Sequence, residues 1–269
     1  PSPFALRPSP FAMPALILAL AALIASVLSF FTGFGLTTVL QPLMLVFFPA
    51  GPAVAMTALV HLLNGLLKVA LTGRHADWGV AWRFGLPAVL AALAGAWLLF
   101  ELLDLPALAH YELAGREFTV TPVKSAIGVI LLLATLAEFL PGRWQWRIRR
   151  RHLVLGGLLS GFFGGLSGHQ GALRSAFLLR AGLSKEAFIG TNAVVSSAID
   201  VARLALYGSL LTLADLQANA GTLSAALAAS FAGVFLGQYL LRKTTLAAVQ
   251  RLVAIVLILM AIGLMTGLV

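Results

Sequence analysis

The sequence has 269 residues, of which 60% are apolar and 10% charged, and its mean hydropathy is +0.99. A soluble domain of this length needs a far more polar surface, so the composition excludes one and indicates a chain whose solvent is mainly lipid. The formal net charge is +9 and there is no cysteine, which excludes disulfides, thiolate catalysis and cysteine metal sites.

The N-terminal region combines an irregular start with a long apolar run. Residues 1–12 contain Pro-Ser-Pro-Phe twice and are expected to form an irregular tail. The next run, Met13–Phe31, follows Arg7 and therefore also fits a signal peptide. Its continuous apolar length, and a copy of its end later in the chain, favour a retained membrane helix, because about 20 apolar residues cross a bilayer.

Gly33 and Gly35 interrupt this first apolar region. A short apolar piece follows at about Thr38–Phe48 and ends at a turn, Pro49–Pro52. At roughly 11 residues it is too short to span a bilayer untilted, so a helical hairpin or half-helix is predicted. Full-length spans are then expected at about Ala53–Thr72, Val80–Leu103 and Pro122–Leu140.

The densest basic cluster, Arg143–Arg151, comes next, and the positive-inside rule places this loop in the cytoplasm. The same order of elements then recurs. A helix at about His152–Phe163 is followed by a glycine break, a short piece at about Gly171–Ala181 and three spans, at about Glu186–Tyr207, Leu216–Leu241 and Leu246–Gly267. Two membrane repeats, residues 13–140 and 152–269, are therefore expected on either side of a basic loop, residues 141–151.

The charges of the loops predict a topology in which each broken hairpin returns to the side it entered from. Both termini then lie outside the cell (inner) membrane, and the halves insert with opposite orientation, as in many secondary transporters. The predicted fold is an all-α polytopic membrane protein with two inverted repeats, each a broken helical hairpin plus three transmembrane helices. The loop residues expected inside are Arg74, Arg83, Arg180, Lys185, Arg242 and Lys243, and those outside are Glu101, Asp104, Glu112 and Glu117.

The most unusual stretch of the chain is Phe162–Arg174. It interrupts an apolar run with four glycines and then presents a hydroxyl, an imidazole, an amide and a guanidinium within eight residues. Backbone that leaves a helix at membrane depth is tolerated only where protein buries it or a watery cavity faces it, so the stretch predicts an internal site. A fainter copy begins at Phe30 and continues through Thr37 and Thr38 to Gln41 and Pro42.

The two glycine-rich breaks occur together with the block Ser167–Leu178 and with Gly190-Thr191-Asn192. In combination these motifs resemble the TauE/SafE sulfite exporter family, also known as the 4-toluenesulfonate uptake permeases, from about residue 14 to 267. The resemblance implies a polytopic permease for small sulfur-containing or organic anions such as sulfite, sulfonates or sulfoacetate. In the family a proline commonly opens the short helix; Pro42 fits this pattern loosely, and Arg174 stands near that place in the second half.

The polar residues at the breaks are the candidate substrate site. Free N–H groups and the helix dipole at the start of a short helix favour an anion, and Arg174 adds a charge with forked donors. Alternatively, Arg174 faces the cytoplasm, His169 only ties the hairpin to neighbouring backbone, and Thr191 and Asn192 cap a helix. The candidate substrate-binding residues are Ser167, Gly168, His169, Gln170, Arg174, Thr37, Thr38, Gln41, Thr191, Asn192 and Arg203.

Two helical faces carry further polar residues. Ser196, Asp200, Arg203 and Tyr207 share one helical face. Either Asp200 and Arg203 neutralise each other, or Arg203 helps to hold the anion while Asp200 sets its charge or carries a proton. His61, Asn64 and Lys68 share a face in the corresponding helix of the first half. Asn64 and Lys68 are possible additional site residues, although Lys68 also fits a side chain that extends toward the inner interface.

Proton coupling has two candidate residues. Asp200 is expected to lie well within a span, and His169 has a side chain that ordinarily titrates near neutral pH. If transport is linked to protons, these two groups would carry them.

The leading functional hypothesis is a secondary anion transporter, with a passive anion channel as the alternative. No G-x-x-x-x-G-K-[ST] loop occurs in the sequence, which argues against ATP drive within this chain. An intramembrane hydrolase with Ser167 as nucleophile and His169 as base is disfavoured, because the G-x-S-x-G motif is incomplete and residues two apart do not face each other on a helix. The expected partners are a small anion and the lipid bilayer, without nucleic acid or cofactor, and a homodimer is left open.

Overall fold

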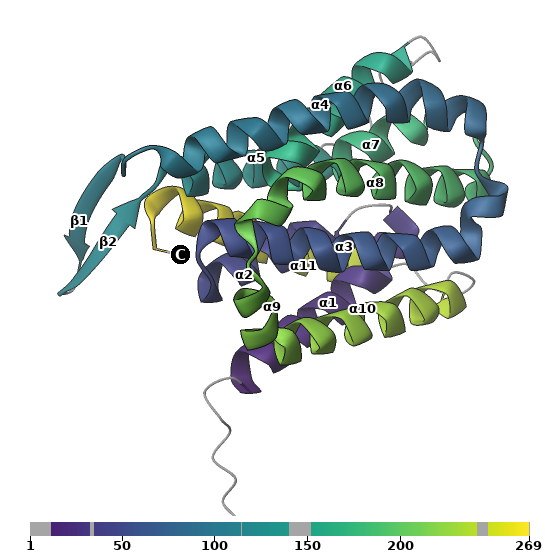
Figure 1. Cartoon of the computed structure of the whole chain (residues 1–269). Coiled ribbons are helices and arrows are strands. Elements are labelled where there is room, and N and C mark those ends of the chain that lie inside the picture. The colour runs from purple at the N-terminus through teal and green to yellow at the C-terminus, as the bar shows by residue number, and fades with distance from the viewer. Residues whose placement is uncertain (1–11, 33–34, 114, 140–151, 241–246, 269) are drawn as a thin grey trace, which may run out of the picture.

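The computed structural model describes residues 12–32, 35–113, 115–139, 152–240 and 247–268 (Figure 1). Residues 1–11 of the predicted tail, Gly33, the basic loop and the Arg242–Lys243 pair lie outside these residues, and Ala12 already belongs to the first helix. Within them the chain forms eleven α-helices and one β-hairpin. They are α1 (Ala12–Thr32), α2 (Leu36–Phe47), α3 (Ala50–Thr72), α4 (Trp78–Asp104), β1 (Ala109–Leu113), β2 (Arg116–Val120), α5 (Pro122–Phe139), α6 (Leu153–Ser167), α7 (Gly171–Leu178), α8 (Lys185–Tyr207), α9 (Leu213–Ala218), α10 (Ala220–Leu240) and α11 (Ala247–Thr266).

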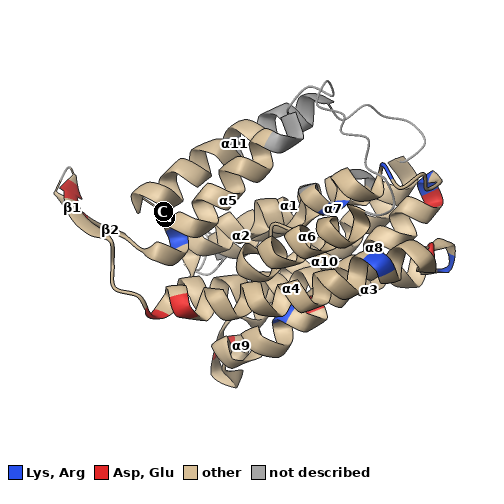
Figure 2. Ribbon diagram, turned by 90° about the horizontal axis from the view of Figure 1, so that it is seen from above, with Lys and Arg blue, Asp and Glu red and all other residues tan. Residues whose placement is uncertain are grey.

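Five of the described segments are long and apolar enough to cross a membrane: Met13–Phe30, Ala50–His75, Trp78–Asp104, Lys185–Leu210 and Ala220–Leu240. The helices α2 and α6 are apolar but shorter, as expected for the broken elements. The protein is therefore a mostly helical, multi-pass membrane protein, as the sequence predicts. In Figure 2 most Lys, Arg, Asp and Glu residues lie toward the ends of the helices, and the ribbon between them is largely tan.

The second break lies further along the chain than predicted. Helix α6 continues through Gly164 and Gly165 to Ser167, and it ends at Gly168, whose φ of 76° is left-handed. A run of glycines does not by itself end a helix, and here the glycines allow α6 to pack closely against α4. The conformation that only glycine adopts readily is needed at Gly168, and α7 begins three residues later.

Two other elements differ from the prediction. The loop after α4 contains an antiparallel β-hairpin, so the chain is not all-α: Tyr111 pairs with Phe118, and the Tyr111 hydroxyl donates to the Thr266 carbonyl at 2.7 Å. The span predicted to begin at Leu216 begins at Ala220 instead. Before it, Thr212 and Asp215 form a capping box that starts the separate short helix α9.

Helices from the two halves of the chain pack against each other. Helix α6 lies along α4, α1 along α10, α3 along α8 and α5 along α11 (Figure 1). The α4–α6 contact is made through backbone: a Cβ on Gly161 would lie 2.0 Å from the Ala88 carbonyl oxygen, and one on Gly165 would lie 2.0 Å from that of Ala92. Small residues permit this approach, which is a common way to pack helices in membranes.

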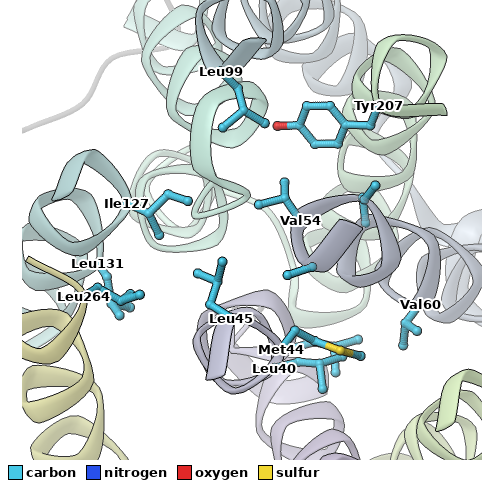
Figure 3. Packing of buried hydrophobic residues seen from close by; sticks show 14 of the residues in the cluster. Leu40, Met44, Leu45, Val54, Val60, Leu99, Ile127, Leu131, Tyr207 and Leu264 are labelled. Atoms are coloured by element: carbon cyan, nitrogen blue, oxygen red, sulfur yellow. The ribbon is translucent and has the colours of Figure 1, made fainter. Parts of the chain in front are cut away.

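Between these pairs lies a core of aliphatic side chains. Leu40, Met44 and Leu45 of α2 lie between α3 and the α5–α11 pair, with Val54 and Ile127 beside them (Figure 3). The first short helix is thus buried over much of its surface, and its polar residues Thr37 and Gln41 are held inside the protein.

The close α4–α6 contact gives a test of the fold. Gly161→Ala is expected to lower the melting temperature clearly, because the new methyl group overlaps the Ala88 carbonyl and such overpacking typically costs about 1–3 kcal/mol. Gly221→Ala is the matched control, since Gly221 also lies in a helix and nothing stands within 4 Å of its missing Cβ. Tryptophan fluorescence during heating in detergent measures both variants, and equal melting temperatures would contradict the packing.

Candidate functional site

One face of α8 carries the polar interior of the protein. Ser196, Asp200, Arg203 and Tyr207 are all buried, and the side chains of Asp200 and Arg203 are 0% exposed. Charged groups this deep in an apolar bundle are costly unless they are paired, so their partners define the site.

Asp200 joins three elements. Its Oδ2 lies 2.5 Å from Nδ1 of His61 on α3, and its Oδ1 lies 2.9 Å from Nη2 of Arg203. The same Oδ1 accepts a hydrogen bond of 3.1 Å from Nε2 of Gln170, in the break between α6 and α7. A single carboxylate therefore links α3 in the first half to the break and α8 in the second.

Arg174 lies inside the protein and is 1% exposed, which excludes the alternative that it faces the cytoplasm. Its Nη1 donates to Oε1 of Gln170 at 2.7 Å and its Nε donates to Oδ1 of Asn192 at 2.6 Å. Gln170 thus connects Arg174 to Asp200, because its amide nitrogen and its amide oxygen bind different partners.

Helix α2, which follows the first break in the sequence, meets the second break at Gly168. A Cβ on Gly168 would lie 2.6 Å from Oε1 of Gln41, 2.6 Å from Cγ2 of Thr37 and 2.7 Å from Nη1 of Arg203. These residues come from α2 and α8, so the structure brings together side chains that are far apart in the sequence. Arg203 Nη1 also donates to the Gly164 carbonyl at 3.4 Å, and the Tyr207 hydroxyl donates to that of Gly165.

Several buried polar atoms around this junction have no hydrogen-bond partner in the described part of the chain. They are Oγ1 of Thr37, both amide atoms of Gln41, Nε2 of His169 and Nε of Arg203. Buried polar atoms are usually paired, and those that are not call for an explanation. Thr37, Gln41 and Arg203 all approach the position of a Cβ on Gly168, and His169 is the next residue in the chain. A polar ligand beside this glycine would give such atoms partners.

The described interior carries more positive than negative charge. Three basic side chains, Lys68, Arg174 and Arg203, lie near one buried carboxylate, Asp200. Lys68 does not extend toward the inner interface: its Nζ donates to Oγ of Ser29 on α1 at 2.6 Å. The arrangement therefore favours an anion, because a negative charge reduces the electrostatic repulsion among these cations.

The paired contacts of the remaining predicted residues lie away from Gly168 or are made with other helices. Thr191 lies about 13 Å along α8 from Asp200, at a rise of 1.5 Å per residue, and its Oγ1 accepts from the Asp77 backbone N–H at 2.9 Å. Thr191 thus holds the α3–α4 connection and is not brought to the junction. Thr38 is buried on α2, and Asn64 donates to Oγ of Ser26 and to the Ser230 carbonyl, at 2.9 and 3.0 Å.

Ser167 and His169 correct one argument made from the sequence. The two side chains touch, with Nδ1 of His169 3.2 Å from Oγ of Ser167, because the helix ends between them at Gly168. The helical spacing rule therefore does not apply here. No catalytic triad results, since the Ser167 hydroxyl donates to the Phe163 carbonyl and Nε2 of His169, where an orienting carboxylate would bind, lacks a partner among the described residues.

His61 is the main residue that sequence reasoning missed. The sequence groups it with Asn64 and Lys68 on one polar helical face without assigning it to the site, and its contact with Asp200 crosses 139 positions of sequence. The helical spacing of His61, Asn64 and Lys68 is the signal in the sequence that could have assigned His61 to the site. Nowhere in the described ranges do three or more His, Asp or Glu side chains gather to hold a metal ion.

Short helices that meet at a buried, cation-rich cluster are typical of multi-pass membrane transporters for charged substrates. Comparison with family models identifies the transporter family: residues 18–264 match the model described as Sulfite exporter TauE/SafE, so the chain belongs to this family. The match confirms the resemblance noted in the sequence, and the family consists of transporters, not enzymes. Searches of curated proteins and of solved structures gave no significant match.

Gly168→Ala tests the junction of the two breaks. The variant is expected to lose more stability than Gly182→Ala, because both glycines have a positive φ, 76° and 77°, but nothing stands within 4 Å of a Cβ on Gly182. Each substitution costs about 1–2 kcal/mol from the left-handed backbone, and only Gly168→Ala also crowds Gln41, Thr37 and Arg203. Melting temperatures in detergent measure the difference, and equal losses would show that the junction is open.

Proposed function

We propose that the protein is a secondary carrier of small sulfur-containing or organic anions such as sulfite, sulfonates or sulfoacetate. The observation that carries the proposal is the excess of buried cations over the buried carboxylate at the meeting point of the two breaks. Family membership supports an anion transporter and leaves the particular anion open.

The anion is proposed to bind beside Gly168. Arg203 offers Nε, and Gln41, Thr37 and His169 add an amide, a hydroxyl and a ring nitrogen that have no protein partner in the described residues. Sulfite and sulfonates carry three oxygens, which match several convergent donors, and guanidinium groups bind such oxygens in a forked geometry. Arg174, held by Gln170 and Asn192, adds positive charge from the start of α7.

The two halves are proposed to be inverted repeats. The main helix contacts occur in matching sets: α1 packs on α10 as α6 packs on α4, α3 contacts α10 as α8 contacts α4, and α2 contacts α11 as α7 contacts α5. The α3–α8 and α5–α11 contacts lie between equivalent helices. This pattern is what a two-fold relation between residues 13–140 and 152–269 would produce, and a site at its centre suits alternating access.

A passive anion channel is the alternative. A carrier coupled to an ion gradient accumulates its substrate above the outside concentration, whereas a channel only equilibrates it. Flux into proteoliposomes with and without an imposed gradient separates the two.

The proposed orientation places both termini outside the cell membrane and the basic residues inside. In this cysteine-free chain, Ser209→Cys after α8 should react with a membrane-impermeant maleimide from outside intact cells, and His75→Cys after α3 only after the membrane is opened. Both positions are exposed and neither native residue carries a fixed charge. The reverse pattern of labelling would overturn the orientation.

Arg174→Ala is expected to weaken anion binding well over tenfold, since losing a charge-assisted partner in a partly dry site costs about 2–5 kcal/mol. Arg180→Ala is the control, because Arg180 is exposed and its Nη1 donates to the Ala176 carbonyl four positions earlier in the chain. Thermal stabilisation by sulfite, sulfate, methanesulfonate and sulfoacetate measures binding to each variant. Equal affinities would remove Arg174 from the site, and a wild type stabilised by none of the four would overturn the proposed function.

A further inference from the structure

The His61–Asp200 pair is the one close contact between ionisable groups that joins the two halves among the described residues. His61 lies on α3 and Asp200 on α8, and α3 packs along α8. The Asp200 side chain is 0% exposed and the His61 side chain is 13% exposed, so His61 is the less enclosed member of the pair.

The two oxygens of Asp200 have separate partners. Oδ2 faces His61, whereas Oδ1 faces Arg203 and Gln170, which belong to the proposed anion site. A substrate anion that binds Arg203 therefore competes with Asp200 for the same guanidinium. Two negative groups beside one cation in an apolar interior repel each other, and a proton taken up by the carboxylate or by its imidazole partner removes this repulsion.

Other charged groups also face the pair. Lys68 lies on α3, Arg174 on α7 and Arg203 on α8, while His169 at the break and Tyr207 on α8 are the further titratable groups near Arg203. Helices α2 and α10, which also pack on α3, carry no charged residue. The charged residues of α4, which packs on α8, are Arg83, Glu101 and Asp104, and all lie toward its ends.

We propose that the His61–Asp200 pair is the proton-binding site of the carrier, and that one proton enters this pair when the anion engages Arg203. The imidazole of His61 and the carboxylate of Asp200 take up the proton together, no covalent bond between heavy atoms changes, and proton and anion cross in the same direction. This inference rests on the proposed function, and it assigns the coupling role to His61 together with Asp200 rather than to His169.

His61→Gln tests the proposal, because glutamine still donates a hydrogen bond to Asp200 but cannot titrate. His110→Gln is the matched control, since His110 is exposed on β1 and bonds Thr119 of the neighbouring strand. The probes are ³⁵S-labelled sulfoacetate and methanesulfonate, whose sulfonate groups stay ionised near neutral pH. Proteoliposomes are clamped at zero membrane potential, and an inward gradient of one pH unit is imposed, which drives about tenfold accumulation for one proton per anion.

The wild type and His110→Gln should accumulate the probe about tenfold, and His61→Gln should fall to the outside concentration while still exchanging labelled for unlabelled probe without a gradient. Calorimetry of the wild type in buffers of different ionisation enthalpy should show uptake of about one proton per bound anion. Undiminished accumulation by His61→Gln, or no proton uptake by a wild type that binds the probe, would overturn this inference alone. A wild type that exchanges neither sulfonate would overturn the proposed function as well.

Discussion

The need to pair the buried carboxylate of Asp200 determines how the interior of this protein is arranged. An isolated carboxylate in such an environment costs several kcal/mol, and Asp200 avoids this cost only because His61, Arg203 and Gln170 reach it from different elements. The relative positions of α3, α8 and the α6–α7 break are thereby linked. Removing any one partner would disturb the other two, because all three share the same two oxygen atoms.

This polar centre requires a surrounding bundle that is packed tightly without bulky groups. The glycines of α6 let its backbone approach the α4 backbone, and Gly233 of α10 has the same relation to the Leu23 carbonyl on α1. Such contacts depend on shape rather than on charge, so they hold the outer helices together while the polar groups satisfy one another inside. Close backbone packing thus occurs between the paired helices, whereas the polar contacts lie in the interior around α8.

The sequence predicts the membrane class, most of the spans and the polar face of α8, because apolar length and helical spacing are local properties. It also predicts that polar groups at the two breaks are internal. It could not locate the end of α6, since four glycines within eight positions each permit a break. Tertiary packing keeps the helix going: Gly165 lies against Ala92 of α4, and Gly164 lies against Gln170. The His61–Asp200 contact could not be predicted for another reason: its two residues meet only through the packing of α3 on α8, which no local pattern specifies.

The hairpin at Ala109–Val120 was missed because a two-stranded element of five residues per strand gives a weak signal beside long helices.

The pairing of α1 with α10 has a consequence for the order in which the protein is assembled. Oγ of Ser26 donates to the Ser230 carbonyl across 204 positions of sequence, and His61 is separated from its partner Asp200 by 139 positions. Because a ribosome makes the chain from its N-terminus, the polar side chains of the first half enter the membrane before their partners exist. Until α8 and α10 arrive, those side chains must be satisfied by water, by headgroups or by the insertion machinery. A nascent chain halted before α8 is therefore an incomplete protein rather than a folded half. Its buried polar contacts are completed only when the last third of the chain has been made.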